Sequence, residues 1–289
     1  MKKKYFLFSF SLLLASCHQN TYLNQITGYS FLPSSKPTTV VKIGLLDSVI
    51  DFQYSSCFKK DTFQDPYDFI DDDTDVSTTN LHGTFLSLLM CGETDNVGIN
   101  KYLQIVPIRI INELGTTTPE LILKGLDYAE KKGCSVVNMS FGSSQTSEEI
   151  KNKIEGSEKG IFFFASSGDN KQNSFLFPAS LGNVFAVSAV DQNGTLFANS
   201  NTDEMKTSIK ALGVNIKIPL ISGKFINKTG SSYATAIVSS IVATCLSYNC
   251  LSEENLRSNN LYDKNGILSI EKFLKNESLI FILFLLLTM

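Results

Sequence analysis

Apolar runs that read as strands alternate along this chain with segments that read as helices. Strands that are apolar throughout are typical of a parallel sheet covered on both faces. The pattern therefore predicts an α/β fold in three layers, with a mostly parallel, twisted sheet between helices. The expected strands are Val40–Leu46, Leu103–Ile111, Ser135–Ser140, Gly160–Ala165 and Val184–Val190, and the expected helices are Phe85–Met90, Pro119–Lys132 and Ser147–Glu158.

Polar residues stand at the ends of three expected strands: Asp47, Ser140 and Ser166. In open parallel sheets, ligands bind outside the carboxyl ends of the strands. The sequence therefore predicts that these three separate segments meet at one edge of the sheet and form a site there.

A serine in a turn of small residues opens the apolar stretch Ala234–Leu246. Ser232, within Gly230–Thr235, would expose its hydroxyl at a helix N-terminus, where amide donors can face a developing oxyanion. Turns of small residues before helices are common, so this motif alone indicates little. Asp47 and His82 change the picture, because each also stands at the end of an expected element.

The three residues can divide a hydrolysis among them. Ser232 would be the nucleophile, His82 the base that takes its proton, and Asp47 the group that fixes the imidazole tautomer. His82 has one rival among the histidines of the chain, His18, which lies beside the N-terminal apolar stretch. Taken alone, Asp47 would be a strand-end cap or turn residue.

Several segments resemble the motifs of the subtilisin-like serine peptidase family, in the family's order. They are Ile43–Ser48, His82–Thr84, Val136–Gly142, Phe177–Ala179, Asn183–Asp191 and Gly230–Thr235. The resemblance implies a subtilisin-like fold and a serine endopeptidase that hydrolyses peptide bonds through an acyl-enzyme. It also implies that Ser140, Phe141 and Gly142 line the cleft and pair with an extended peptide. An esterase is disfavoured, because no Gly-x-Ser-x-Gly motif surrounds Ser232.

One departure from the family concerns the oxyanion. Ala165–Asn170 resembles the segment in which an asparagine amide faces the oxyanion, but Asp169 stands at that position. An ionised aspartate cannot donate a hydrogen bond. A protonated Asp169, the amide of Asn170 or the Ser232 backbone N–H remain as donors. The alternative is a peptide-binding or scaffold relative that keeps the fold but turns over poorly.

Five carboxylates crowd the segment Asp68–Asp75. Calcium takes six to eight oxygen ligands, and this segment resembles a calcium loop of some family members. Asp68, Asp71, Asp73 and Asp75 are the candidate ligands, and a solvated acidic loop is the alternative. No cofactor is expected beyond this structural calcium.

The N-terminus has the pattern of an export signal. Lys2–Lys4 precede an apolar stretch, and Leu14–Cys17 resembles a bacterial lipoprotein box. This predicts a signal peptide at 1–17, lipidation of Cys17, a tether at 18–39 and a peptidase domain at 40–276. An ordinary signal peptide is the alternative.

The last segment, 277–289, is a hydrophobic tail too short to span a bilayer. It could pack on the core, lie at a membrane interface or contact a partner. The net charge of −3 and the absence of a polybasic stretch do not favour nucleic acid. The expected partners are therefore a peptide or protein substrate and, through Cys17, a membrane at the cell envelope.

Overall fold

The computed structural model describes residues 39–48, 50–54, 58, 61–77, 79–91, 103–249, 254 and 256. The predicted signal peptide, lipidation site and C-terminal tail lie outside these residues, and so does most of the tether.

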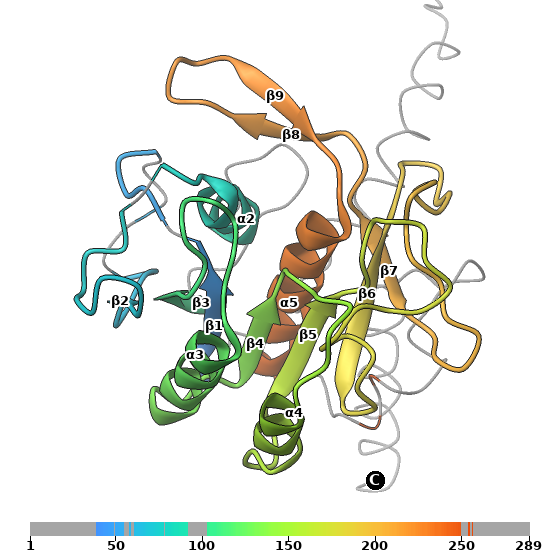
Figure 1. Cartoon of the computed structure of the whole chain (residues 1–289). Coiled ribbons are helices and arrows are strands. Elements are labelled where there is room, and N and C mark those ends of the chain that lie inside the picture. The colour runs from blue at the N-terminus through green and yellow to red at the C-terminus, as the bar shows by residue number, and fades with distance from the viewer. Residues whose placement is uncertain are drawn as a thin grey trace, which may run out of the picture.

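Within the described residues, seven parallel strands form one sheet in the order β2-β3-β1-β4-β5-β6-β7 (Figure 1). They are β1 (Val41–Asp47), β2 (Tyr67–Asp68), β3 (Leu103–Arg109), β4 (Val136–Met139), β5 (Phe162–Ser166), β6 (Val184–Val190) and β7 (Ile209–Leu212). Every residue of β4, β5 and β6 is buried, which explains why these strands are mostly apolar. The predicted strands are confirmed, with their ends displaced by no more than two residues.

Helices cover both faces of the sheet and complete three layers (Figure 1). On one face lie α2 (His82–Cys91) and α5 (Ser231–Ser247), which pack against each other and against the strands. The other face carries α3 (Pro119–Lys131) and α4 (Glu148–Glu155). A separate apolar core lies under each pair of helices. The α/β fold predicted from the sequence is therefore confirmed.

The helices α3 and α4 both begin after an N-cap residue with a hydroxyl side chain. The side chain of Thr118 accepts a hydrogen bond from Leu121 N, and that of Ser147 accepts one from Ile150 N. These bonds satisfy amides that have no partner inside the helix. None of the helices in the described ranges combines the length and apolarity that a membrane span requires.

The central strand β1 has β3 on one side and β4 on the other. The chain therefore leaves β1 toward one side of the sheet and later returns to build the opposite side. Such a reversal opens a crevice at the carboxyl ends of the two strands, where ligands bind in open α/β sheets. Asp47 ends β1 at this crevice, and Ser140 directly follows β4.

An antiparallel hairpin, β8 (Ile216–Pro219) with β9 (Phe225–Lys228), projects from the sheet beside α2 (Figure 1). Its side chains alternate between buried and exposed in β8 and are half-buried or exposed in β9. The sequence analysis missed this hairpin, because its strands are short and not apolar throughout. It also missed β2 and β7, which are short as well.

Candidate active site

Asp47 and His82 form a hydrogen-bonded pair. His82 is the first residue of α2, and its Nδ1 lies 2.8 Å from Asp47 Oδ1. The same oxygen accepts a 2.7 Å hydrogen bond from Ser48 N. Asp47 is 2% exposed, whereas the His82 side chain is 32% exposed. With the carboxylate as acceptor, Nδ1 carries the ring proton and Nε2 of the neutral ring keeps its lone pair.

Two polar side chains hold the start of α2 against the end of β1. Gly83 N donates to Ser48 Oγ at 3.0 Å, and Ser48 Oγ donates to Asn80 O at 2.9 Å. His82 N in turn donates to Asn80 Oδ1 at 3.2 Å. The sequence analysis did not single out Asn80. Its signal was present, because asparagine just before a helix often satisfies the first amides.

The pKa of His82 is raised above its ordinary value of 6.5. Burial is the largest influence and lowers the pKa, and the charge of Lys228 lowers it further. The charge of Asp47 and the hydrogen bond to it outweigh both, because they stabilise the imidazolium. A base in this position is suited to hold a proton that it takes from a neighbouring hydroxyl.

Ser232 is the second residue of α5, where the first amides have no intrahelical partner. Its Oγ donates a 2.8 Å hydrogen bond to Ser140 O, and Ser140 Oγ donates to Ser232 O at 3.0 Å. Within the described residues, no hydrogen bond joins Ser232 Oγ to His82. The complete triad therefore stays a prediction, although its Asp47–His82 half has the expected geometry.

A buried polar connection fastens α5 to β4 beneath Ser232. Asn138 Nδ2 donates to Ser140 Oγ at 2.9 Å, and Ser239 Oγ donates to Asn138 Oδ1 at 3.0 Å. Asn138 and Ser239 are both fully buried. These two residues position the serine turn, and sequence reasoning did not identify their role. The available signal was an asparagine inside an otherwise apolar strand.

Asp169 lies against the serine turn. Its Oδ2 accepts hydrogen bonds from Ser231 N at 2.8 Å and Ser231 Oγ at 2.9 Å. Its Oδ1 is buried and has no hydrogen-bond partner among the described residues. Asn170 is exposed, and its N–H donates to Asn201 Oδ1 at 3.1 Å. Of the two predicted oxyanion residues, Asp169 therefore has the closer contact with the serine turn.

Burial raises the pKa of Asp169, although the two hydrogen bonds from Ser231 oppose the shift. The carboxyl therefore holds a proton at higher pH than an ordinary aspartate does. A protonated carboxyl has one O–H donor, and Oδ1 is the oxygen of Asp169 that has no hydrogen-bond partner among the described residues. A protonated Asp169 is therefore free of the limit that applies to an ionised aspartate, which cannot donate a hydrogen bond to an oxyanion.

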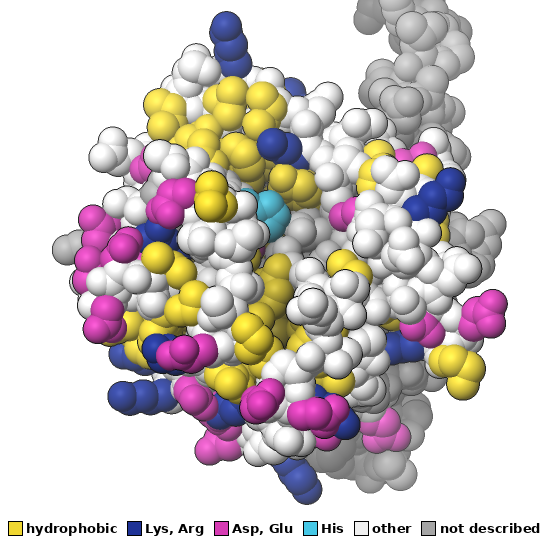
Figure 2. Space-filling model, in the orientation of Figure 1, with side chains coloured by type: hydrophobic (Ala, Val, Ile, Leu, Met, Phe, Trp, Pro, Cys, Tyr) yellow, Lys and Arg dark blue, Asp and Glu magenta, His cyan; other side chains and the backbone are white. Residues whose placement is uncertain are grey.

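A pocket of about 600 Å³ lies beside His82 and Tyr233, between the loop at Leu114 and the hairpin β8–β9. Figure 2 shows this face, where a cyan histidine lies among apolar side chains. The Tyr233 ring centroid is 6.0 Å from that of His82. Burial raises the pKa of Tyr233 to about 12, and the charge of Asp47 adds to the shift, so its hydroxyl stays neutral near pH 7.

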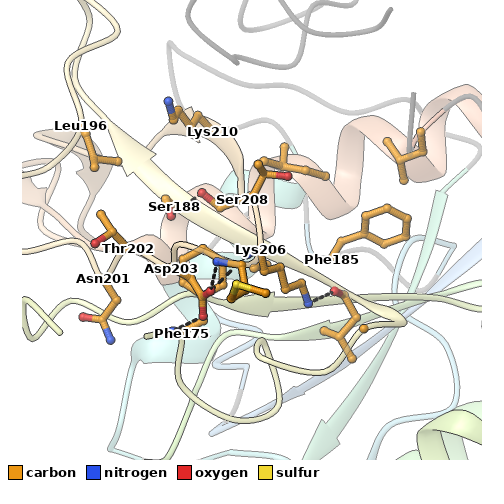
Figure 3. Close-up of a pocket in the computed structure, with 17 residues that line it drawn as sticks. Phe175, Phe185, Ser188, Leu196, Asn201, Thr202, Asp203, Lys206, Ser208 and Lys210 are labelled. Atoms are coloured by element: carbon orange, nitrogen blue, oxygen red, sulfur yellow. Dashed lines mark hydrogen bonds between the residues drawn. The ribbon is translucent and has the colours of Figure 1, made fainter. Parts of the chain in front are cut away.

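A second pocket, of about 720 Å³, lies beside β6 and β7 and includes none of the three predicted triad residues (Figure 3). Lys206 extends along it, and its ammonium group donates to three backbone carbonyl oxygens. The distances to Ala179 O and Val184 O are both 2.7 Å, and Leu181 O is the third acceptor. The ammonium group of Lys206 thus holds three carbonyl groups of the segment that leads into β6.

The acidic loop is organised around an arginine. Arg109, 2% exposed at the end of β3, contacts Asp68 Oδ2 at 2.5 Å and Asp71 Oδ2 at 2.7 Å, and it also pairs with Glu113. Asp73 and Asp75 accept hydrogen bonds from backbone amides within the loop. No group of three or more His, Cys, Asp or Glu side chains converges as metal ligands within the described ranges. Arg109 thus balances the charge of two of the four candidate calcium ligands, Asp68 and Asp71.

Calcium binding by this loop stays an untested prediction. If calcium binds the native state, it should raise the melting temperature by mass action. Replacing both Asp71 and Asp73 by asparagine should abolish that rise. A melting temperature that is the same in chelator and in excess calcium would leave the charge balance of the loop to Arg109.

A thermophilic serine proteinase of Bacillus sp. (strain AK1) is 29% identical over 230 residues, which make up 78% of this chain and 55% of that protein. The chain thus spans about half the length of this relative. Subtilisin DY of Bacillus licheniformis is 26% identical over 227 residues, covering 75% of this chain and 81% of its own.

A solved structure with the same fold is a mutant of the protease domain of PatA. It matches with a TM-score of 0.70 at 20% identity, over 85% of this chain and 99% of that one. The model of the subtilase family, a family of peptidases, matches residues 38–261, which is well over half of the chain. The chain therefore belongs to the subtilase family.

Proposed function

We propose that this chain is an exported serine endopeptidase that hydrolyses peptide bonds through an acyl-enzyme on Ser232. The observation that carries the proposal is the 2.8 Å contact between His82 Nδ1 and buried Asp47, beside the turn that holds Ser232. Family membership supports a peptide or protein as the substrate.

In the proposed reaction, Ser232 Oγ attacks the carbonyl carbon of the peptide bond while His82 Nε2 takes the hydroxyl proton. Asp47 stabilises the imidazolium that forms. The tetrahedral intermediate places its negative oxygen near the Ser232 N–H and Asp169. When the C–N bond breaks, His82 returns the proton to the leaving amine, and the acyl group remains on Ser232.

Deacylation repeats these steps with water. His82 takes a proton from the water as its oxygen attacks the ester carbonyl. Collapse of the second intermediate returns that proton to Ser232 Oγ and releases a carboxylic acid. Before the first attack, Ser232 Oγ must release Ser140 O and turn toward His82.

A catalytically weak, peptide-binding relative is the second candidate. Two observations favour it: the Ser232 hydroxyl donates to Ser140 O, and Asp169 stands where the family has an amide donor. Labelling with an alkyl fluorophosphonate separates the candidates without knowledge of the substrate. An activated Ser232 should be labelled, and mass spectrometry of the digested protein should locate the adduct on it. Absence of labelling at every pH tested would favour the binding protein.

The export part of the proposal rests on the sequence at 1–17, outside the described residues. Lipidation at Cys17 would anchor the mature domain at the cell envelope through the tether 18–39. We expect the mature protein to start at Cys17 and to partition into detergent. Cys17→Ala should block processing or release the protein. If the wild type and the variant both fractionate as soluble protein, the prediction that Cys17 is lipidated is wrong.

A further inference from the structure

The hairpin β8–β9 projects from the rest of the domain and ends in a turn with exposed apolar side chains (Figure 1). Ile221 in this turn is 64% exposed, and Phe225 at the start of β9 is 52% exposed. In Figure 2, apolar side chains gather at the top of the molecule, where Figure 1 places the hairpin. Exposed apolar side chains that gather on a projecting element are typical of a surface that contacts a protein or a membrane.

The two faces of the hairpin differ in burial. On the inner face, Ile216 and Ile218 are fully buried in the core under α2 and α5. Lys217 stands between them and therefore points to the opposite face, where it is exposed. Its Nζ lies 4.1 Å from the centroid of the Phe225 ring. The core thus fixes the hairpin by its inner face, and its outer face and turn are left exposed.

The hairpin carries positive charge in a chain that is acidic as a whole. The segment Ile216–Lys228 contains three lysines and no aspartate or glutamate, whereas the net charge of the chain is −3. Lys217 and Lys224 are exposed beside the apolar turn. Lys228 is half-buried, with its ammonium group 5.3 Å from the centroid of the Phe85 ring. A basic patch around apolar side chains complements a surface that is anionic outside and apolar beneath.

A lipid bilayer with anionic headgroups has both properties. The headgroups attract lysines, and apolar and aromatic side chains enter the interface below them. A protein partner fits less well, because the cores of protein interfaces are depleted in lysine and a projecting turn offers little area to bury. The predicted lipidation of Cys17 would also hold the domain at a membrane.

We propose that the tip of the hairpin, residues 220–225, inserts into the surface of an anionic membrane. Ile221 and Phe225 enter the interface, and Lys217 and Lys224 contact the headgroups. This membrane contact goes beyond the proposed peptidase function and is tested independently of it.

The contact has a consequence for the candidate active site. Leu220 and Ile226 of the hairpin line the pocket beside His82. A hairpin that is inserted by its tip therefore holds this pocket near the membrane surface.

The experiment uses tryptophan fluorescence, because the chain contains no tryptophan of its own. Ile221→Trp introduces a single probe at the tip, at an exposed position that tolerates a larger side chain. The full chain with this substitution is added to vesicles of phosphatidylcholine and phosphatidylglycerol, with or without bromine on the acyl chains. We expect the emission to shift to shorter wavelength in both and to be quenched in the brominated vesicles, because the indole ring enters the interface.

Met205→Trp is the matched control. Met205 is 95% exposed and lies before β7, beside a pocket that includes no residue of the hairpin. Its emission should be the same in brominated and unbrominated vesicles. An unchanged melting temperature shows that each variant is folded.

The lysines are tested in the Ile221→Trp protein by adding Lys217→Gln and Lys224→Gln together. Each lysine near an anionic surface strengthens the contact by about fivefold. The ratio of inserted to free tip, measured by the extent of quenching, should therefore fall by about 25-fold. Vesicles of phosphatidylcholine alone should quench the Ile221→Trp protein less than the anionic vesicles do.

Three results would overturn the inference. The Ile221→Trp protein is not quenched by brominated vesicles, the Met205→Trp protein is quenched equally, or vesicles of phosphatidylcholine alone quench as strongly as anionic ones. The peptidase function fails by a different result, the absence of fluorophosphonate labelling at Ser232. That reaction does not report on insertion of the tip, so the two failures are distinguishable.

Discussion

Replacing Ser232 with alanine should lower kcat for a peptide substrate by several orders of magnitude while the fold stays intact. The loss of the catalytic serine or histidine in subtilisin costs about 2 × 10⁶-fold in kcat, so a comparable loss is expected here. The fold should tolerate the change, because Ser232 is only half-buried and its hydroxyl makes one hydrogen bond, to Ser140 O. Initial rates and the melting temperature measure the two effects.

His82→Ala should cost nearly as much, and the double variant should be little worse than either single one, because the two residues act in the same step. Ser222→Ala is the matched control for the serine, since Ser222 is exposed at the tip of the hairpin. It should keep the wild-type rate. If Ser232→Ala keeps more than about 1% of the activity, the nucleophile is another residue and the proposed mechanism is wrong.

Replacing Asp169 with asparagine should raise turnover at neutral and alkaline pH. Asp169 can donate to the oxyanion only while protonated, and its raised pKa widens the pH range in which that form exists. As pH rises through this pKa, the donor is lost and activity falls. His82 must be neutral to act as base, so activity also falls as pH decreases through its raised pKa. The wild type should therefore show a bell-shaped profile.

An asparagine at 169 carries a permanent donor. Its oxygen can keep the hydrogen bond from Ser231 N, and its NH₂ can take the place of Oδ1, the oxygen with no described partner. The alkaline limb of the profile should disappear. Where wild-type Asp169 is fully ionised, the rate should rise by about 100- to 1000-fold, the usual effect of one oxyanion donor.

The control for this change is Asp127→Asn, which makes the same chemical substitution on the surface of α3. Its pH profile should match the wild type. If Asp169→Asn has an unchanged profile and no higher rate, Asp169 does not serve the oxyanion. The Ser232 N–H and Asn170 then become the better candidates.

The elements that could be predicted from the sequence are those whose burial produces a run of neighbouring apolar residues. A strand covered on both faces, such as β6, is apolar at every position except Ser188, so its bounds can be predicted without knowledge of the neighbouring strands. Asp47 and His82 could also be identified as candidate site residues from the sequence, because each lies where an expected element ends or begins. Their 2.8 Å pairing then follows from the packing of α2 beside β1.

Features that depend on partners far along the chain could not be predicted in this way. Arg109 contacts Asp68, 41 residues away in the sequence, and Asp169 contacts Ser231, 62 residues away. The periodic pattern of apolar and polar residues within one segment does not predict such contacts. Analysis of the acidic loop alone therefore did not identify Arg109 as the partner of Asp68.

Lys206 has a consequence for how the fold responds to its surroundings. Carbonyl oxygens that converge on one point normally need a dissolved cation, whose occupancy changes with the ionic composition of the medium. Here the positive charge is covalently part of the chain, and its ammonium group reaches Ala179 O and Val184 O at 2.7 Å. Dilution or chelators cannot remove it. The backbone of the segment before β6 should therefore keep its conformation at both low and high ionic strength.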